Sequence, residues 1–279
     1  MTIIMFPHIT FIGGGNMAAS LIGGLIADGC PASHITVAEP DTSKLAQLQQ
    51  DFGVTTNTNN NTAIASAQVV ILAVKPQIMQ PVCHQLGGTV QQNKPLIISI
   101  AAGIRSHDID RWLGNNTAIV RCMPNTPALL RCGATGLFAN NKVTASQRDI
   151  AQRILSAAGI TTWVNSENLI DAVTAVSGSG PAYFFLLMEA MMAAGEKLGL
   201  DKKTAQQLTL QTALGAARMA IESDVDAATL RTRVTSKGGT TEAAIKHFQE
   251  NHFAELVNAA LNAASHRAGE LADILGKDS

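Results

Sequence analysis

The chain has 279 residues, enough for one or two domains, and 46% of them are apolar, enough for a sizeable core. A net charge of −1 provides no electrostatic footprint for nucleic acid or an anionic membrane, so neither is an expected partner. The four cysteines are scattered, and the seven histidines form no H-x-x-x-H pair. This pattern favours reduced thiols in the cytoplasm and predicts no metal site.

The first segment, residues 9–25, has the pattern of a strand, a glycine turn and a helix. At the turn, Gly13-x-Gly15-x-x-Ala18 is the Gly/Ala form of the dinucleotide fingerprint. Gly13 permits a sharp turn, Gly15 lets a pyrophosphate approach the backbone, and Ala18 lets the helix pack close to the strand. Amides at the helix start would hold the anion. The sequence predicts nucleotide binding by Ile12, Gly13, Gly14, Gly15, Asn16 and Met17.

A second strand is expected over residues 35–38, followed by Glu39 and Pro40. In dinucleotide-binding folds, a carboxylate at this point accepts from the 2′-hydroxyl of NAD and repels the 2′-phosphate of NADP. Glu39 therefore favours NAD, although Pro40 could turn it toward solvent. After a helix over residues 42–52, the polar residues 54–62 are expected to form a solvated loop that caps the next helix. The alternative is that their asparagines contact a phosphate.

Three later runs are almost continuously apolar, which is typical of strands buried on both faces of a parallel sheet. They are residues 67–74, 96–100 and 118–123. Each is followed by a small or polar loop, and ligands of open α/β sheets bind outside such strand ends. Further strands are expected at residues 137–138 and 160–164. This α/β alternation predicts a Rossmann-type, doubly wound parallel sheet as an N-terminal domain, residues 1–164.

From residue 165 the pattern is helical, which predicts an all-α domain over residues 165–279. Residues 177–181 are expected to break the chain before an apolar helix. The apolar run of that helix, 182–194, is shorter than the roughly 20 residues of a membrane span, so we expect it to be buried. This domain is hydrophobic on more than one face, which predicts burial against another subunit. Its other helices are expected over residues 204–223, 227–232 and 253–275.

Residues 234–242 contain two glycines before Thr240 and Thr241, and a helix follows. Backbone amides at the start of that helix would hold a carboxylate. The alternative is an ordinary N-cap, in which one of the threonines satisfies the helix itself. From these residues alone, the N-cap is the favoured interpretation.

Six segments along the chain together resemble pyrroline-5-carboxylate reductase, the last enzyme of proline synthesis. In order they are IGGGNMA, AVKPQ, SIAAG, RCMPNTP, DAVTAVSGSGPAY and VTSKGGTTEAAI. The first is generic, whereas the last two are far more specific. The resemblance covers nearly the whole chain and implies NAD(P)H-dependent hydride transfer to the C=N bond of a cyclic imine, giving proline.

The resemblance also implies which residues form the site. Beside the glycine turn, it assigns cofactor contacts to Glu39, Asn60, Ala73, Val74, Lys75, Pro76, Ile100, Ala101 and Ala102. It assigns substrate contacts to Met123, Pro124, Asn125, Glu167, Val234, Ser236, Gly238, Gly239, Thr240 and Thr241. In the family this last loop comes from the neighbouring subunit of an interlocked homodimer, and such dimers often join as a decamer, a pentamer of dimers. Thr241 thereby becomes the expected catalytic residue, bonded to the ring nitrogen.

Two positions depart from the family pattern. Lys237 stands where the family usually has proline, and Glu39 is acidic although the family commonly prefers NADPH. The expected cofactor is NADP(H), with NAD(H) also possible. One alternative is a 3-hydroxyacid dehydrogenase, which needs a general base, usually a lysine, on the apolar helix; residues 183–196 contain none. Another is a nucleotide sensor without turnover, against which the intact substrate loop argues.

Overall fold

The computed structural model describes residues 6–277. These residues divide into two compact units, which we call the sheet unit and the helical unit. The sheet unit runs to Ser179 and resumes at Ala263, and the helical unit is Gly180–Asn262. The expected division lay between residues 164 and 165. Residues 165–179 and the end of the last helix make most of their contacts with the sheet unit and form one compact body with it.

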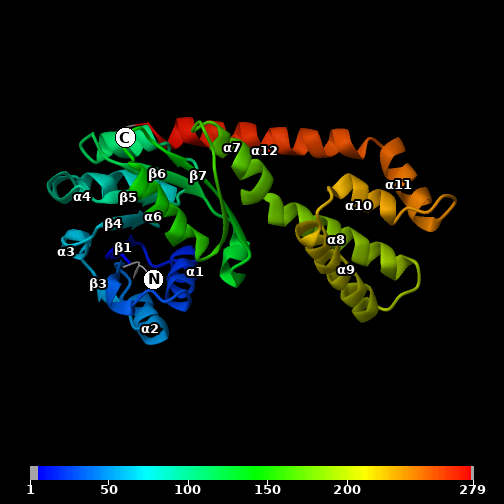
Figure 1. Ribbon diagram of the computed structural model, residues 1–279, viewed down its shortest axis with the longest axis horizontal. Helices are drawn as coiled ribbons and strands as arrows, with labels where there is room; N and C mark the ends of the chain where they lie inside the picture. Colours follow the sequence, from blue (N-terminus) through cyan, green and yellow to red (C-terminus); the bar gives the residue numbers. More distant parts are fainter. Residues whose placement is uncertain (1–5, 278–279) are drawn as a thin grey trace. The chain divides into compact units, whose positions relative to one another are not determined.

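Eight strands of the sheet unit form one sheet in the order β3-β2-β1-β4-β5-β6-β7-β8 (Figure 1). Neighbouring strands are parallel except β6 and β7, which are antiparallel, so the expectation of a wholly parallel sheet is wrong at this pair. The connection between them is shorter than the dozen or so residues that a parallel crossover needs. The bounds are β1 Ile9–Ile12, β2 Ile35–Ala38, β3 Thr55–Asn57, β4 Val69–Leu72, β5 Leu96–Ser99, β6 Ile119–Met123, β7 Gly133–Ala139 and β8 Gly159–Trp163.

Helices cover both faces of this sheet, as a doubly wound fold requires. Ile9 and Phe11 of β1 pack with residues of α1, α2 and α6, whereas Ile12 packs with residues of α3, α4 and α5. This division follows from the alternation of side chains along a strand. The predicted fold class is therefore confirmed. The bounds are α1 Asn16–Ala27, α2 Thr42–Phe52, α3 Asn60–Ile64, α4 Met79–Asn93, α5 Ser106–Trp112, α6 Ala145–Ser156 and α7 Leu169–Val173.

The polar stretch at residues 54–62 is not the predicted loop. Its first part forms the edge strand β3, which pairs in parallel with β2, and its end begins α3. β-branched threonines suit an edge strand, where polar side chains can face water. The predicted capping role is confirmed, because the Asn59 side chain accepts a hydrogen bond from the amide of Thr62 at 3.0 Å.

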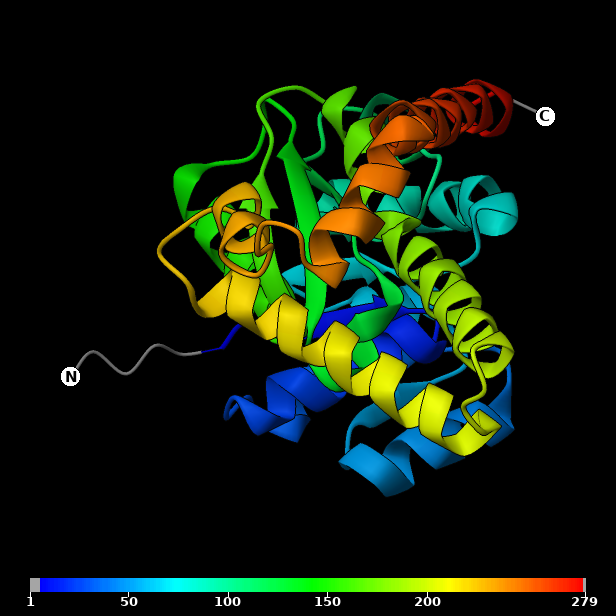
Figure 2. The same ribbon diagram turned by 90° about the vertical axis from the view of Figure 1, so that its right-hand side faces the viewer.

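The helical unit contains no strand among its described residues. Its helices are α8 Gly180–Lys197, α9 Lys202–Glu222, α10 Ala227–Arg233, α11 Thr240–Glu250 and α12 Phe253–Leu275, of which α12 continues into the sheet unit. Helices α8 and α9 form a helical hairpin, and Figure 2 shows both helices along their full length.

The expected break before the apolar helix is absent in the described chain. Instead, the π-helical segment η4 (Thr174–Gly178) continues α7 into α8, giving one helix of 29 residues, Leu169–Lys197. The whole helix is longer than the predicted apolar run, 182–194. By length and composition it could cross a membrane. Only 17% of its most apolar window is buried, and the expectation of a buried helix is wrong for the single chain. Among the described residues, α9 packs against α8 but leaves most of the apolar surface of α8 exposed.

The four cysteines are all free thiols, and three of them are buried. Burial raises the pKa of the Cys83 thiol to about 12 and also raises the pKa values of Cys30 and Cys122. Because the thiolate is the reactive form, we expect Ellman's reagent to titrate one thiol per native chain, Cys132, and all four after denaturation. A second thiol that reacts fast in the native protein would contradict these placements.

Candidate active site

The glycine turn joins the end of β1 to the start of α1. Gly13 has a φ of +102°, and a Cβ there would lie 2.6 Å from the carbonyl oxygen of Ala73, so only glycine fits without strain. Gly15 is the N-cap of α1 and no side chain caps this helix. A Cβ built on Gly15 meets nothing within 4 Å, so the backbone there is open to a ligand. The first amides of α1 can therefore receive an anion.

Glu39 follows β2 and turns toward the glycine turn rather than into solvent. Its Oε2 accepts a hydrogen bond from the amide of Gly14 at 2.9 Å, and its Oε1 accepts one from Asp41 at 3.3 Å. The ammonium group of Lys44 lies 4.0 Å away, and the Glu39 side chain is 13% exposed. Pro40 thus does not point this carboxylate away, and the acid stands at the strand end that faces a ribose in this fold.

Strands β1, β4, β5 and β6 end at the same edge of the sheet because they are parallel neighbours. The loop after β4 lies beside the glycine turn, and the loops after β5 and β6 follow it along the same edge. The Ala73 amide donates to Ile12 at 2.8 Å, and the Ile100 amide donates to Leu72 at 3.2 Å. The side chain of Lys75 is exposed, and the backbone carbonyl oxygen of Lys75 accepts a hydrogen bond from the amide of Ile78. The edge brings together the remaining expected cofactor residues Val74, Pro76, Ala101 and Ala102, with Met123 and Pro124 beside them.

Three side chains that were expected to bind cofactor or substrate form hydrogen bonds within the sheet unit instead. Asn125 donates to the carbonyl oxygen of Ser177 at 3.0 Å and accepts from the amide of Ala134 at 2.9 Å. Asn60 donates to Gln85 on α4 at 3.2 Å. Glu167 is bonded as described next. The side chains of these three residues therefore serve the fold in this structure.

Glu167 belongs to a polar cluster with Ser106, Arg121 and Asp171, in which Ser106 and Arg121 are buried and the two carboxylates are partly buried. It accepts two hydrogen bonds of 2.6 Å from the amide and hydroxyl of Ser106, and Arg121 lies 3.2 Å away. Arg121 is 3% exposed, and its other terminal nitrogen is 3.7 Å from Asp171, too far for a hydrogen bond. Burial raises the pKa of the Asp171 carboxyl, which the guanidinium groups of Arg121 and Arg105 oppose.

The sequence analysis missed Arg121 and Ser106. A signal was present for Arg121, because it is a single charge in an apolar run read as a buried strand. Ser106 gave no signal, since its role depends on a partner 61 residues away. Among residues 6–277, no group of three histidine, cysteine or acidic side chains could hold a metal ion.

The loop between α10 and α11 belongs to the helical unit and carries Val234, Ser236 and the Gly238–Thr241 turn. Gly238 has a φ of +71°, and Gly239 is the N-cap of α11. No side chain caps this helix, so the interpretation that Thr240 or Thr241 is an ordinary N-cap is wrong. Val234 and Thr240 are exposed, and Thr241 is half-buried. The start of α11 thus presents amides next to two threonine hydroxyls.

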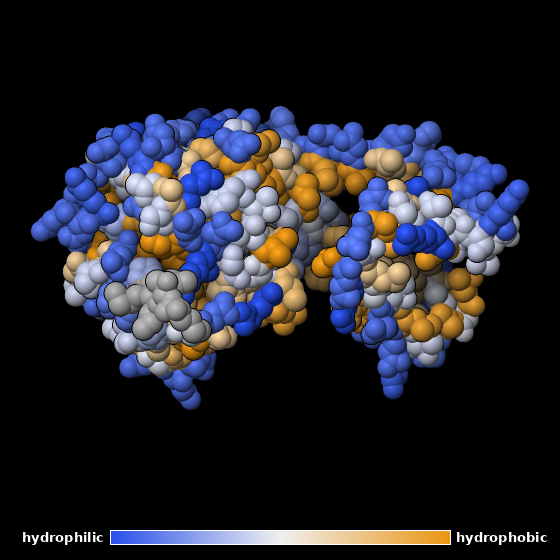
Figure 3. All heavy atoms as spheres, in the orientation of Figure 1, coloured by the Kyte–Doolittle hydropathy of each residue, from blue (hydrophilic) through white to orange (hydrophobic). Residues whose placement is uncertain are grey.

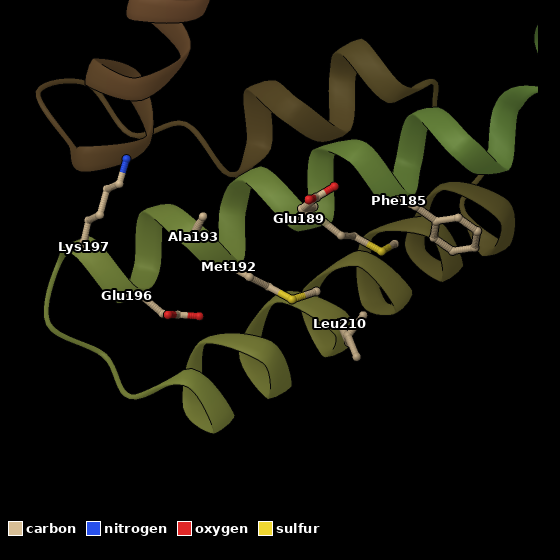
Figure 4. A pocket seen from close by; sticks show the side chains of 8 residues that line it. Phe185, Glu189, Met192, Ala193, Glu196, Lys197 and Leu210 are labelled. Atoms are coloured by element: carbon tan, nitrogen blue, oxygen red, sulfur yellow. The ribbon is translucent and has the colours of Figure 1, made fainter.

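The helical unit exposes many large apolar side chains, and apolar residues reach the surface in the space-filling view (Figure 3). A pocket between α8 and α9 is lined by Phe185, Met192 and Leu210, with Glu189 and Glu196 beside them (Figure 4). Lys197 is the last residue of α8, so the apolar helix does carry a lysine, one residue beyond its expected end. Exposed apolar area of this extent is typical of a subunit interface.

The glycine turn at the switch point of the sheet and the all-helical unit that follows are typical of an NAD(P)-dependent oxidoreductase. Two family models match the chain: NADP oxidoreductase coenzyme F420-dependent over residues 8–103, and pyrroline-5-carboxylate reductase dimerisation over residues 167–271. The pyrroline-5-carboxylate reductase of Pseudomonas aeruginosa is 58% identical over 97% of this chain and 99% of that protein. The chain belongs to the pyrroline-5-carboxylate reductase family, as its motifs indicate.

Solved structures agree with this assignment. A pyrroline-5-carboxylate reductase from Coxiella burnetii is 48% identical, with a TM-score of 0.92 over 95% of this chain and 98% of that one. A pyrroline carboxylate reductase from Plasmodium falciparum with NADP bound is 26% identical, with a TM-score of 0.82 over 95% and 98%. The family model for dimerisation spans the whole helical unit and the adjoining parts of the sheet unit, which supports a homo-oligomer.

Proposed function

We propose that this protein reduces 1-pyrroline-5-carboxylate to L-proline with NADPH. The observation that carries the proposal is that α1 and α11 each begin directly after a run of glycines and have no side-chain cap. Both can receive anions, as a dinucleotide and an amino-acid carboxylate require. Membership of the family supports the choice of substrate.

The residues of the glycine turn fit NADP(H). The amides of Gly15, Asn16 and Met17 hold the pyrophosphate, and the open backbone at Gly15 leaves room for it. Glu39 lies beside the adenosine ribose, and the loops after β4 and β5 lie beside the nicotinamide. When bound, the cofactor supplies the hydride that adds to the imine carbon. NAD(H) is also accepted, because Glu39 can accept from its 2′-hydroxyl.

The Gly238–Thr241 turn binds the substrate. Backbone amides at the start of α11 hold the carboxylate, and the hydroxyl of Thr241 donates to the ring nitrogen. As the C=N bond becomes CH–NH, the carbon gains the hydride and the nitrogen gains a proton, which Thr241 relays. Met123 and Pro124 line the sheet side of the site. Holding the reacting atoms about 3–3.5 Å apart accounts for most of the acceleration.

The working form is a homodimer, in which the turn at Gly238–Thr241 of one chain serves the cofactor edge of its partner, and dimers join into decamers. The exposed face of α8 lies in the subunit contact rather than in a membrane, and the protein works in the cytoplasm without nucleic acid. The functional division follows residues 1–164 and 165–279, because the dimerisation model begins at residue 167.

Loss of NADPH absorbance on adding 1-pyrroline-5-carboxylate tests the proposed function. We expect turnover, with proline formed in equal amount to the NADPH consumed. The control replaces the imine by a 3-hydroxyacid with NADP+, for which we expect no reduction. Cofactor binding without absorbance loss would indicate a nucleotide sensor, and hydroxyacid oxidation would indicate the dehydrogenase alternative.

Glu39 is expected to set the balance between the two cofactors. Replacing it with serine should raise the ratio of kcat/KM for NADPH to that for NADH about tenfold, because a negative charge beside the 2′-phosphate is removed. Glu39→Gln keeps an oxygen for the Gly14 amide and should raise the ratio as well. Steady-state kinetics with both cofactors give the ratio, and an unchanged value in both variants would exclude Glu39 from cofactor selection.

A further inference from the structure

Two of the amides expected to hold the substrate carboxylate already have partners. The amide of Gly238 donates to Oε2 of Glu242 at 2.7 Å, and the amide of Gly239 donates to the carbonyl oxygen of Ser236 at 3.0 Å. The first bond joins the turn to α11, and the second lies within the turn that precedes α11. The sequence analysis counted Gly238 and Gly239 as substrate ligands, and their amides are engaged in this structure.

The next amides are those of Thr240 and Thr241, the first two residues of α11. The first amides of any α-helix have no partner within the helix. At α11 the N-cap is Gly239, and no side chain caps the helix. The threonine amides are therefore among the donors that the start of α11 leaves open, and they lie beside the hydroxyl of Thr241.

Glu242 is the side chain that closes this turn. It reaches back from the first turn of α11 to the amide of Gly238, one residue before the N-cap, whereas the glutamate of a capping box bonds the amide of the N-cap itself. In a capping box an N-cap side chain returns the bond, but here the N-cap is glycine and returns none. Gly238 itself has a φ of +71°. Glycine adopts this conformation easily, but it also adopts many others, so the residue alone does not fix the turn.

We propose that Glu242 is a positioning residue for the substrate. Its hydrogen bond to Gly238 fixes the turn, so that the amides of Thr240 and Thr241 converge on the carboxylate while the Thr241 hydroxyl faces the ring nitrogen. This inference rests on the proposed function of the turn. It assigns the role to the acceptor oxygen of Glu242 and not to its charge, since a second anion beside a carboxylate site is unfavourable.

The test compares Glu242→Ala, Glu242→Gln and, as a matched control, Glu250→Ala. Glu250 lies at the other end of α11 and forms an exposed ion pair with Lys246. We expect Glu242→Ala to raise KM for 1-pyrroline-5-carboxylate five- to tenfold, with KM for NADPH within twofold of the wild type. Glu242→Gln keeps the acceptor and should have a KM for the imine equal to or below the wild-type value. Glu250→Ala should match the wild type.

Amide hydrogen exchange of Gly238 provides a readout that needs no activity. We expect slow exchange in the wild type and in Glu242→Gln, and at least tenfold faster exchange in Glu242→Ala. The inference is overturned if exchange at Gly238 is equal in all variants, or if the glutamine variant is as impaired as the alanine variant. An inactive wild type with the expected exchange pattern would instead refute the proposed function while leaving the closed turn in place.

Discussion

Replacing Thr241 with alanine is expected to lower kcat/KM for 1-pyrroline-5-carboxylate about 100-fold. The variant loses the hydroxyl that donates to the ring nitrogen and relays its proton, and removing one such positioned donor costs roughly 10²–10³ in rate. The backbone amide of residue 241 remains, so carboxylate binding should suffer less than turnover. Steady-state rates at saturating NADPH, with the imine varied, measure this loss.

Two variants make the Thr241 result specific. Thr241→Ser keeps a hydroxyl at the same position and should retain at least a tenth of wild-type kcat/KM. Thr240→Ala removes the neighbouring hydroxyl but keeps its amide, and it should lose less than fivefold. KM for NADPH should stay within twofold in all three proteins. If Thr241→Ala were as active as the wild type, the threonine would have no part in the reaction.

Replacing Arg121 with alanine is expected to lower the free energy of unfolding by up to about 3–5 kcal/mol, because it leaves two partly buried carboxylates without their counter-charge. Arg121 is 3% exposed and lies between Glu167 and Asp171, which are 19% and 18% exposed. Urea unfolding at one fixed protein concentration measures the change, since oligomer stability depends on concentration.

The control for this prediction is Arg218→Ala. Arg218 forms an exposed pair with Glu222 on α9, and such surface pairs contribute about 0–1 kcal/mol. We expect its unfolding curve to lie close to that of the wild type. A loss below about 1 kcal/mol for Arg121→Ala would show that the polar cluster does not stabilise the sheet unit.

Local patterns sufficed to predict most of the fold. The bounds of α2 and α12 follow directly from their apolar spacing, and the glycine turn lies where its fingerprint places it. The antiparallel pairing of β7 escaped prediction because strand direction depends on the connection rather than on the strand's own residues. The join of α7 to α8 escaped because glycine and serine usually break a helix, whereas here a π-helical turn carries the chain through them.

In the candidate site, the local geometry was predictable only where it depends on one short segment. The glycine turn and the Gly238–Thr241 turn are such segments, since consecutive residues supply their amides. Asn125 and Glu167 are different, because their polar side chains have partners far away in the sequence. A motif shows that such a residue is polar, but only the fold shows which atoms it contacts.

We propose that each site combines the glycine turn of one chain with the Gly238–Thr241 turn of its partner. Hybrid dimers give the most direct test of this arrangement. Gly15→Val fills the pyrophosphate space, and Thr241→Ala disables the substrate turn, so each variant alone should be nearly inactive. Co-expression with two different tags allows assemblies that contain both chains to be purified. Because each mixed dimer has one intact site, we expect activity far above that of either parent, up to about half of the wild-type value. Activity no higher than that of either parent would contradict a shared site.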